Sequence, residues 1–155
     1  MSQHAMQHVG ASVAWRDISL TQRIMGVATG ALLGIDAFVH LNDASQYDSF
    51  RSSVMSEGTL FRIQGVVAIV VALAVLLWPS ITTWIVSLLV AGSAVGAVIL
   101  YTYVNVGQLG PIPNLYEHTW HAAGKIPSAV AEGLAFLISV AGLIMAVRAR
   151  RRAAV

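Results

Sequence analysis

Four long apolar runs, separated by more polar segments, dominate the sequence. They cover roughly residues 20–41, 60–78, 84–106 and 127–147. Each is close to about 20 residues, the length that an α-helix needs to cross the hydrocarbon core of a bilayer. The pattern therefore predicts an all-α fold, a transmembrane four-helix bundle whose helices run up, down, up and down.

Short polar motifs mark the ends of these runs. Ser19 followed by Gln22 is typical of a capping box at the start of the first helix, and Pro79 stops the second helix. Only a very short turn separates the second run from the third. These two helices are therefore expected to be antiparallel neighbours.

The other two connections are longer and predict two short interfacial helices on the outer side. Asp43 and Gln46 have capping-box spacing in the first connection, and Asn114 and Glu117 have it in the second, where Gly124 would end the helix. Both segments are too polar to span a membrane. They are expected to lie along the headgroups and to cover the outer mouth of the bundle.

The basic residues are unevenly distributed. Six of the nine flank the side that holds both termini, and the other three, Arg51, Arg62 and Lys125, fall on the opposite side. The positive-inside rule then places both termini in the cytoplasm. Residues 1–19 and 148–155 become cytoplasmic tails of a multi-pass protein of the cytoplasmic (plasma) membrane, and residues 20–147 form its membrane domain.

Composition narrows the classes of function. The chain is 57% hydrophobic and 10% charged, which indicates a lipid bilayer as its main surroundings. It has no cysteine and therefore no thiolate ligand or cysteine nucleophile. No basic run interleaved with aromatic residues suggests nucleic-acid binding. No catalytic triad, phosphate loop or catalytic carboxylate pair has usable spacing, so an enzyme is not favoured.

The first run contains a ridge of glycines. Gly26, Gly30 and Gly34 recur at every fourth position, which gives two overlapping GxxxG units. Such a ridge allows another helix to approach closely in lipid. It indicates either docking on a larger membrane protein or self-association of this chain.

The predicted topology gathers polar residues at the outer end of the bundle. Asp36 and His40 are neighbours on one face of the first helix, because they are four positions apart. A carboxyl group inside a membrane needs a partner or water. The predicted buried polar cluster consists of Asp36, His40, Arg62, Asn105 and Glu132.

The same region holds a candidate metal site. The predicted ligands, imidazoles and carboxylates that suit zinc or copper, are His40, His118, His121, Asp36 and Glu117. A b-type haem between His40 and a loop histidine would use the same residues. His-x-x-His alone matches no established metal motif.

Two further readings stay open. Proton- or ion-coupled transport would use Asp36 and Glu132, but the inner halves of the runs are almost purely apolar. The reading that the sequence favours is a non-enzymatic accessory or scaffold subunit, in which the polar cluster holds the outer ends of the helices together.

Four segments carry a resemblance to a protein group. They are HLND at 40–43, GTLFRIQG at 58–65, LGPIPNLYEHTW at 109–120 and AEG at 131–133. With these segments the chain resembles uncharacterised small four-span integral membrane proteins of actinobacteria, over most of its length. The resemblance implies the four-span architecture and no particular activity.

Overall fold

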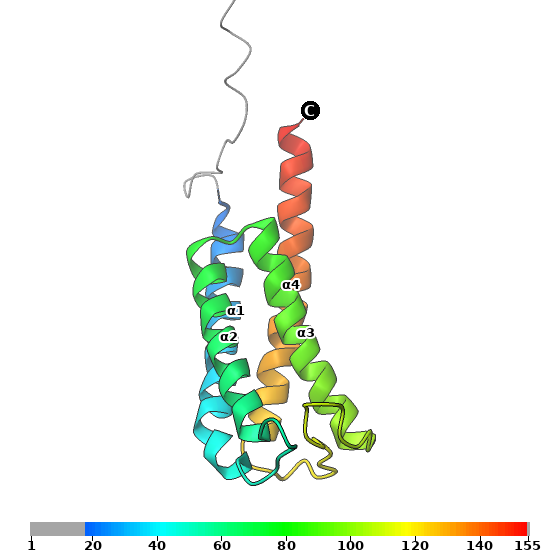
Figure 1. Cartoon of the computed structure of the whole chain (residues 1–155). Coiled ribbons are helices and arrows are strands. Elements are labelled where there is room, and N and C mark those ends of the chain that lie inside the picture. The colour runs from blue at the N-terminus through cyan, green and yellow to red at the C-terminus, as the bar shows by residue number, and fades with distance from the viewer. Residues whose placement is uncertain (1–17, 155) are drawn as a thin grey trace, which may run out of the picture.

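The computed structural model describes residues 18–154. Its four long α-helices are each long and apolar enough to cross a membrane. The predicted all-α four-helix bundle is confirmed (Figure 1). Most of the predicted N-terminal tail, residues 1–17, lies outside the described residues. In chain order the elements are α1 (Leu20–Asp43), the 3-10 helix η2 (Ala44–Tyr47), α2 (Glu57–Leu77), α3 (Ile81–Tyr103) and α4 (Lys125–Ala153).

Serine side chains begin three of the helices. Ser19 Oγ accepts a hydrogen bond from the Gln22 backbone N–H at 3.3 Å, as the sequence predicts. Ser56 caps α2 in the same way. Ser80 caps α3 and forms a complete capping box with Thr83. Each cap satisfies a backbone donor that would otherwise have no partner, which fixes where the helix begins.

The glycine ridge of α1 packs against α2. A Cβ added at Gly26 would lie 2.9 Å from the Val75 carbonyl oxygen, and one added at Gly30 would lie 3.3 Å from that of Ala72. Only a glycine allows the two backbones to approach so closely. A Cβ at Gly34 would meet nothing within 4 Å. Two of the three ridge glycines thus serve a contact inside the chain, and docking on another protein or self-association stays a prediction.

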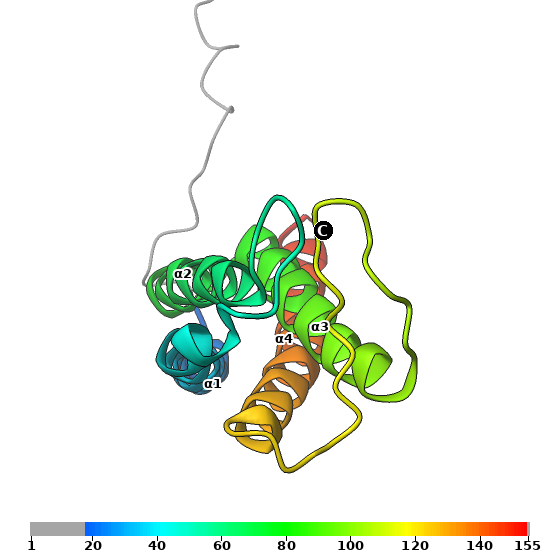
Figure 2. The same ribbon diagram turned by 60° about the horizontal axis from the view of Figure 1, so that its bottom comes forward.

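The two ends of the bundle differ. The loop end holds residues 44–56 and 104–124, and the turn end holds residues 78–80, the start of α1 and the end of α4 (Figure 1). At the turn end, α4 continues well past the α2–α3 connection, so the segment predicted as a basic tail is helical through its four arginines to Ala153. At the loop end, the α3–α4 connection runs around the end of α3 and back to α4 (Figure 2).

The interior is layered from one end to the other. Fully buried hydroxyls of Thr29, Ser87 and Ser139 lie in the half toward the turn end, where Ser87 and Ser139 share a hydrogen bond of 2.8 Å. One turn further toward the loop end lies the apolar layer, a core cluster made of Leu33, Val71, Ala72, Ala91 and Ala135. The next turn of α1 carries Asp36, and the next turn of α4 carries Glu132.

The prediction of two interfacial helices needs correction. Only the single 3-10 turn of η2 forms in the first connection, and the Asp43 side chain does not cap it. No helix forms between residues 104 and 124. Asn114 Oδ1 accepts from the Tyr116 N–H at 3.1 Å, and the Glu117 N–H donates instead to the Tyr101 carbonyl at 3.0 Å. The predicted capping box therefore does not form, because the backbone N–H that would donate to Asn114 donates to α3.

Candidate functional site

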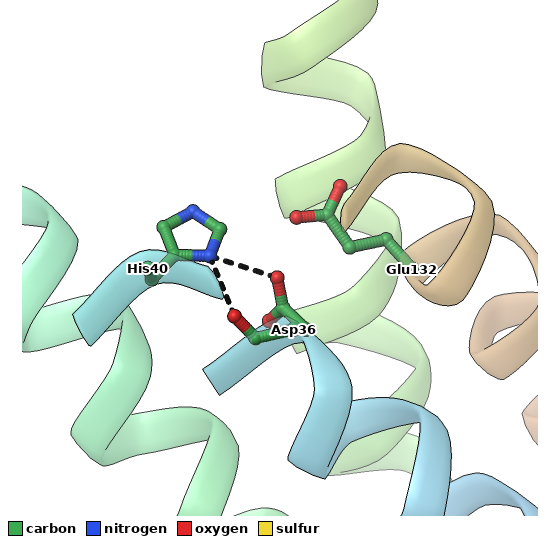
Figure 3. A group of neighbouring side chains, drawn as sticks. All are labelled: Asp36, His40 and Glu132. Atoms are coloured by element: carbon green, nitrogen blue, oxygen red, sulfur yellow. Dashed lines mark hydrogen bonds and ion pairs between the residues drawn. The ribbon is translucent and has the colours of Figure 1, made fainter. Parts of the chain in front are cut away.

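Three titratable side chains converge where α1 and α4 meet near the loop end. Asp36 and Glu132 are fully buried, and His40 is 13% exposed. Each offers one potential ligand atom, and these three atoms all lie within 4.8 Å of one another. Figure 3 shows the Glu132 carboxyl group across from the pair formed by Asp36 and His40. Among residues 18–154 no other group of three histidine or acidic residues comes so close.

Local helix geometry positions the first two residues. Asp36 and His40 lie one turn apart on α1, so their side chains are adjacent. His40 Nδ1 lies 2.9 Å from Asp36 Oδ1 and 3.0 Å from the Asp36 carbonyl oxygen. Without a bound ion, the contact with the carbonyl oxygen places a proton on Nδ1, and an ion bound at Nδ1 would replace that proton. The imidazole also packs edge-on against Phe61 of α2, with ring centroids 4.9 Å apart, which fixes its orientation.

Two neutral side chains complete the surroundings of Asp36. Gln64 Nε2 of α2 donates to Asp36 Oδ2 at 3.2 Å. Ser128 Oγ of α4 lies 2.8 Å from Asp36 Oδ1 and 3.0 Å from Glu132 Oε1. Three helices thus contribute to one polar site, and a buried carboxylate obtains the donors that it needs there.

Glu132 is not satisfied in the same way. Its Oε2 atom is buried and has no hydrogen-bond partner in the described part of the chain. An unsatisfied polar atom in an interior costs about 1–3 kcal/mol. Either a proton on Glu132 or a bound cation would remove this cost. The Glu132 side chain therefore marks the site as one that takes up a positive charge.

A cavity of about 340 Å³ borders the cluster. His40, Gln64, Ser128 and Glu132 line it, together with residues of α2, α3 and the second connection. A ligand in the cavity would therefore have direct access to His40 and Glu132.

The structure separates the other predicted site residues from this cluster. Arg62, predicted for the buried cluster, lies on the surface, where its guanidinium forms two hydrogen bonds of 2.7 and 2.8 Å with Asp48. Asn105 is exposed, and its Oδ1 accepts from the Gly107 N–H at 3.1 Å. Neither side chain reaches Asp36. The polar side chains that contact Asp36 from the other helices are thus Gln64 and Ser128, and not Arg62 or Asn105.

The predicted metal ligands of the second connection lie elsewhere. His118 and His121 are exposed, and neither lines the cavity. Glu117 does line it, but its Oε2 accepts from the Tyr47 hydroxyl at 3.3 Å, and it is not part of the three-residue group. Of the predicted metal ligands, only Asp36 and His40 lie together in the structure. The third member of their group is Glu132, and not a residue of the second connection.

Sequence reasoning missed two residues of the site. Neither Gln64 nor Ser128 belongs to the predicted cluster or to the predicted metal ligands. A signal for Ser128 exists, because it lies four positions before Glu132 and therefore on the same face of the helix. Gln64 has no comparable signal, since its role depends on how α2 packs against α1.

Comparisons with known proteins add no identification. No protein-family model, no curated protein and no solved structure matches the chain. The resemblance to actinobacterial four-span proteins stays a prediction. The fold defines the class, a multi-pass membrane protein with four spans.

Proposed function

We propose that this membrane protein binds one divalent transition-metal ion through Asp36, His40 and Glu132. The observation that supports the proposal is the convergence of three donor atoms within 4.8 Å, one of which belongs to a fully buried glutamate with an unpartnered oxygen. Histidine nitrogen together with carboxylate oxygen suits zinc and similar borderline ions. Three protein ligands leave one position of a tetrahedral ion for a water or a small ligand from the cavity.

Charge balance favours a cation of this kind. With a neutral imidazole, Asp36 and Glu132 carry two negative charges when both are ionised. Isolated charges inside a membrane are costly. A divalent cation cancels both charges without a further positive group. Arg62 does not provide such a group, because it is exposed and pairs with Asp48.

The metal proposal takes precedence over the accessory or scaffold role that the sequence favoured. That role rested on the glycine ridge as an outward docking surface, and Gly26 and Gly30 pack on α2 instead. Haem binding has less support, because no second imidazole belongs to the group of His40 in residues 18–154. Transport through the bundle would have to pass the apolar layer around Leu33.

We also propose that the loop end faces away from the cytoplasm. Among the described residues, five basic residues lie toward the turn end and three toward the loop end, which matches the positive-inside rule. The metal site would then open to the extracytoplasmic side of the membrane. Fusions of a reporter that is active only in the cytoplasm test this orientation. The C-terminal fusion should be active, and an inactive C-terminal fusion would reverse the orientation.

A zinc titration of purified protein without a polyhistidine tag, in lipid nanodiscs, tests the metal proposal. Wild type should bind one ion per chain, and Glu132→Gln and His40→Ala should each weaken binding at least about tenfold, because each removes a ligand. His118→Ala is the matched control, since it removes an exposed imidazole and should leave the affinity unchanged. Equal affinities in all four proteins, or no stoichiometric binding, would overturn the proposal.

A further inference from the structure

The cavity at the loop end has a polar rim and an apolar interior. On α3 it is lined from Ser93 near the middle of the helix to Tyr101 near its end. At 1.5 Å per residue, these positions are about 12 Å apart along the helix. The cavity is therefore elongated along the bundle, from the connecting loops to the middle of the spans.

Small residues on α3 create this space. The cavity wall on α3 includes Ala94, Ala97 and Val98, and the facing wall on α2 includes Leu60 and Ile63. These walls are apolar. A volume of about 340 Å³ falls within the range of small-molecule sites, which combine apolar walls with a few polar groups.

The rim is acidic, and the carboxyl group of one of its acids accepts no hydrogen bond. Glu57, Glu117 and Asp43 line the cavity near its mouth, opposed by a single lysine, Lys125. The Lys125 ammonium donates to the carbonyl oxygens of Glu117 and Thr119 in the second connection. Charge at the mouth is therefore negative, and the lysine is held by backbone oxygens.

Glu57 is the rim residue that points to a ligand. Asp43 accepts from Asn42 Nδ2 at 2.8 Å, and Glu117 accepts from the Tyr47 hydroxyl. Glu57 is only 9% exposed, and its carboxylate accepts no hydrogen bond from any described residue. A buried, ionisable group without a hydrogen-bond donor in a ligand-sized cavity is typical of a binding site.

We propose that the cavity binds an amphiphilic organic cation, an alkylamine or alkylammonium compound, with its charged head at Glu57 and its alkyl chain between α2 and α3. The carboxylates of Glu57 and Glu117 attract the head, and the aromatic rings of Tyr47 and Tyr101 at the same level offer cation–π contacts. The apolar walls take the chain. This site shares its cavity with the proposed metal site but uses a different carboxylate, because Glu57 is not one of the three proposed ligands.

The test measures binding of hexyltrimethylammonium and of hexanol, which has the same alkyl chain and no charge, by calorimetry in nanodiscs of zwitterionic lipid. Wild type should bind the cation saturably. Glu57→Gln should weaken cation binding about tenfold, the effect of losing one charged contact, and should leave hexanol binding unchanged. Asp48→Asn is the matched control, because Asp48 is an acid of the same end that does not line the cavity.

A second pair of variants tests the part of the cavity that would hold the alkyl chain. Ala97→Phe should abolish binding of both probes by filling the space between α2 and α3, whereas Ala31→Phe, at an exposed position of α1, should not. The absence of saturable cation binding in wild type, or equal binding in Ala97→Phe and Ala31→Phe, would overturn the proposal. Zinc affinity is measured in the same samples. Glu57→Gln should keep it, which separates failure of this inference from failure of the metal proposal.

Discussion

Ser128 and Asp36 are 92 positions apart in the chain, and the Ser128 hydroxyl lies 2.8 Å from the Asp36 carboxyl oxygen Oδ1. The same hydroxyl lies 3.0 Å from Glu132 Oε1. A hydroxyl has one proton and can donate to only one acceptor at a time. Ser128 can therefore donate to one of the two carboxyl groups at a time, and Asp36 also accepts from His40 and Gln64. The Glu132 Oε2 atom is left without a donor, and a proton or a cation would meet its need. This requirement underlies the proposal of a metal site.

Ser128 should act as an orienting partner of the metal ligands. Residues that hydrogen-bond to ligands typically contribute 10- to 100-fold to metal affinity. Ser128→Ala should therefore weaken zinc binding about tenfold, as measured by titration. Ser139→Ala is the control, because it removes a buried hydroxyl from the same helix at the Ser87 contact, away from the ligands. An equal loss of affinity in both variants would mean that general packing, and not orientation, explains the effect.

Metal binding should release protons. Two states of the site are neutral: an imidazolium with one carboxylate and one carboxylic acid, or a neutral imidazole with two carboxylates and a divalent ion. The second state holds two protons fewer, because ligands bind a metal in their deprotonated form. Calorimetry in buffers of different ionisation enthalpy should give about two protons released per zinc ion.

The same balance sets the direction of the pH dependence. Because protons compete with the ion, the affinity should fall as the pH falls below neutral. The Glu132→Gln variant has one carboxyl group fewer and should release about one proton. A zinc affinity that does not change with pH would contradict this description of the site.

The α1–α2 contact makes a prediction about stability. Gly26→Ala should lower the free energy of unfolding by about 1–2 kcal/mol, because its methyl group would press on the Val75 carbonyl. Gly34→Ala, in the same ridge and helix, places its methyl group in open space and should cost nothing. Unfolding of both variants by sodium dodecyl sulfate, followed by circular dichroism, makes the comparison. A loss of stability in Gly34→Ala alone would mean that the ridge docks outward.

The surface ion pair of Asp48 and Arg62 leads to a prediction about the pKa of Asp48. The Arg62 guanidinium, with help from the Ser56 hydroxyl, lowers the pKa of Asp48 from its usual 3.8 to about 2. The lowered pKa means that this contact stabilises the loop fully above about pH 4 and is lost as the pH falls through about 2. Arg62→Gln should return the pKa of Asp48 toward 3.8 in a carbon-13 NMR titration. Arg51→Gln, which removes a weaker influence, should shift it less, and equal shifts would contradict the pairing.

The span pattern of the fold could be predicted because bilayer thickness sets helix length. The ends of the helices were predicted where a side chain adjacent in sequence decides them, as Ser19 does for α1. The second interfacial helix was predicted wrongly because the backbone hydrogen bond expected at its start is made with a residue distant in sequence. The Glu117 N–H donates to Tyr101 of α3, which no pattern within residues 107–127 reveals.

The candidate site shows the same division. Asp36 and His40 could be paired from sequence because they are one helical turn apart. Choosing Glu132 over His118 and His121 required the rotation of α4 about its axis, which packing determines. The glycine ridge was recognised from spacing, but spacing alone does not say whether the helix that packs on it belongs to the same chain. Here it is α2, through Val75 and Ala72.

X-ray absorption at the zinc edge, on the protein loaded with one ion per chain, tests the metal site most directly. Binding by Asp36, His40 and Glu132 predicts one imidazole and otherwise oxygen ligands, with Zn–N near about 2.0–2.1 Å. In His40→Ala the imidazole contribution should disappear, and in His118→Ala it should persist. A spectrum with two or more imidazoles, or one that His40→Ala leaves unchanged, would place the ion at the loop histidines and contradict the proposed site.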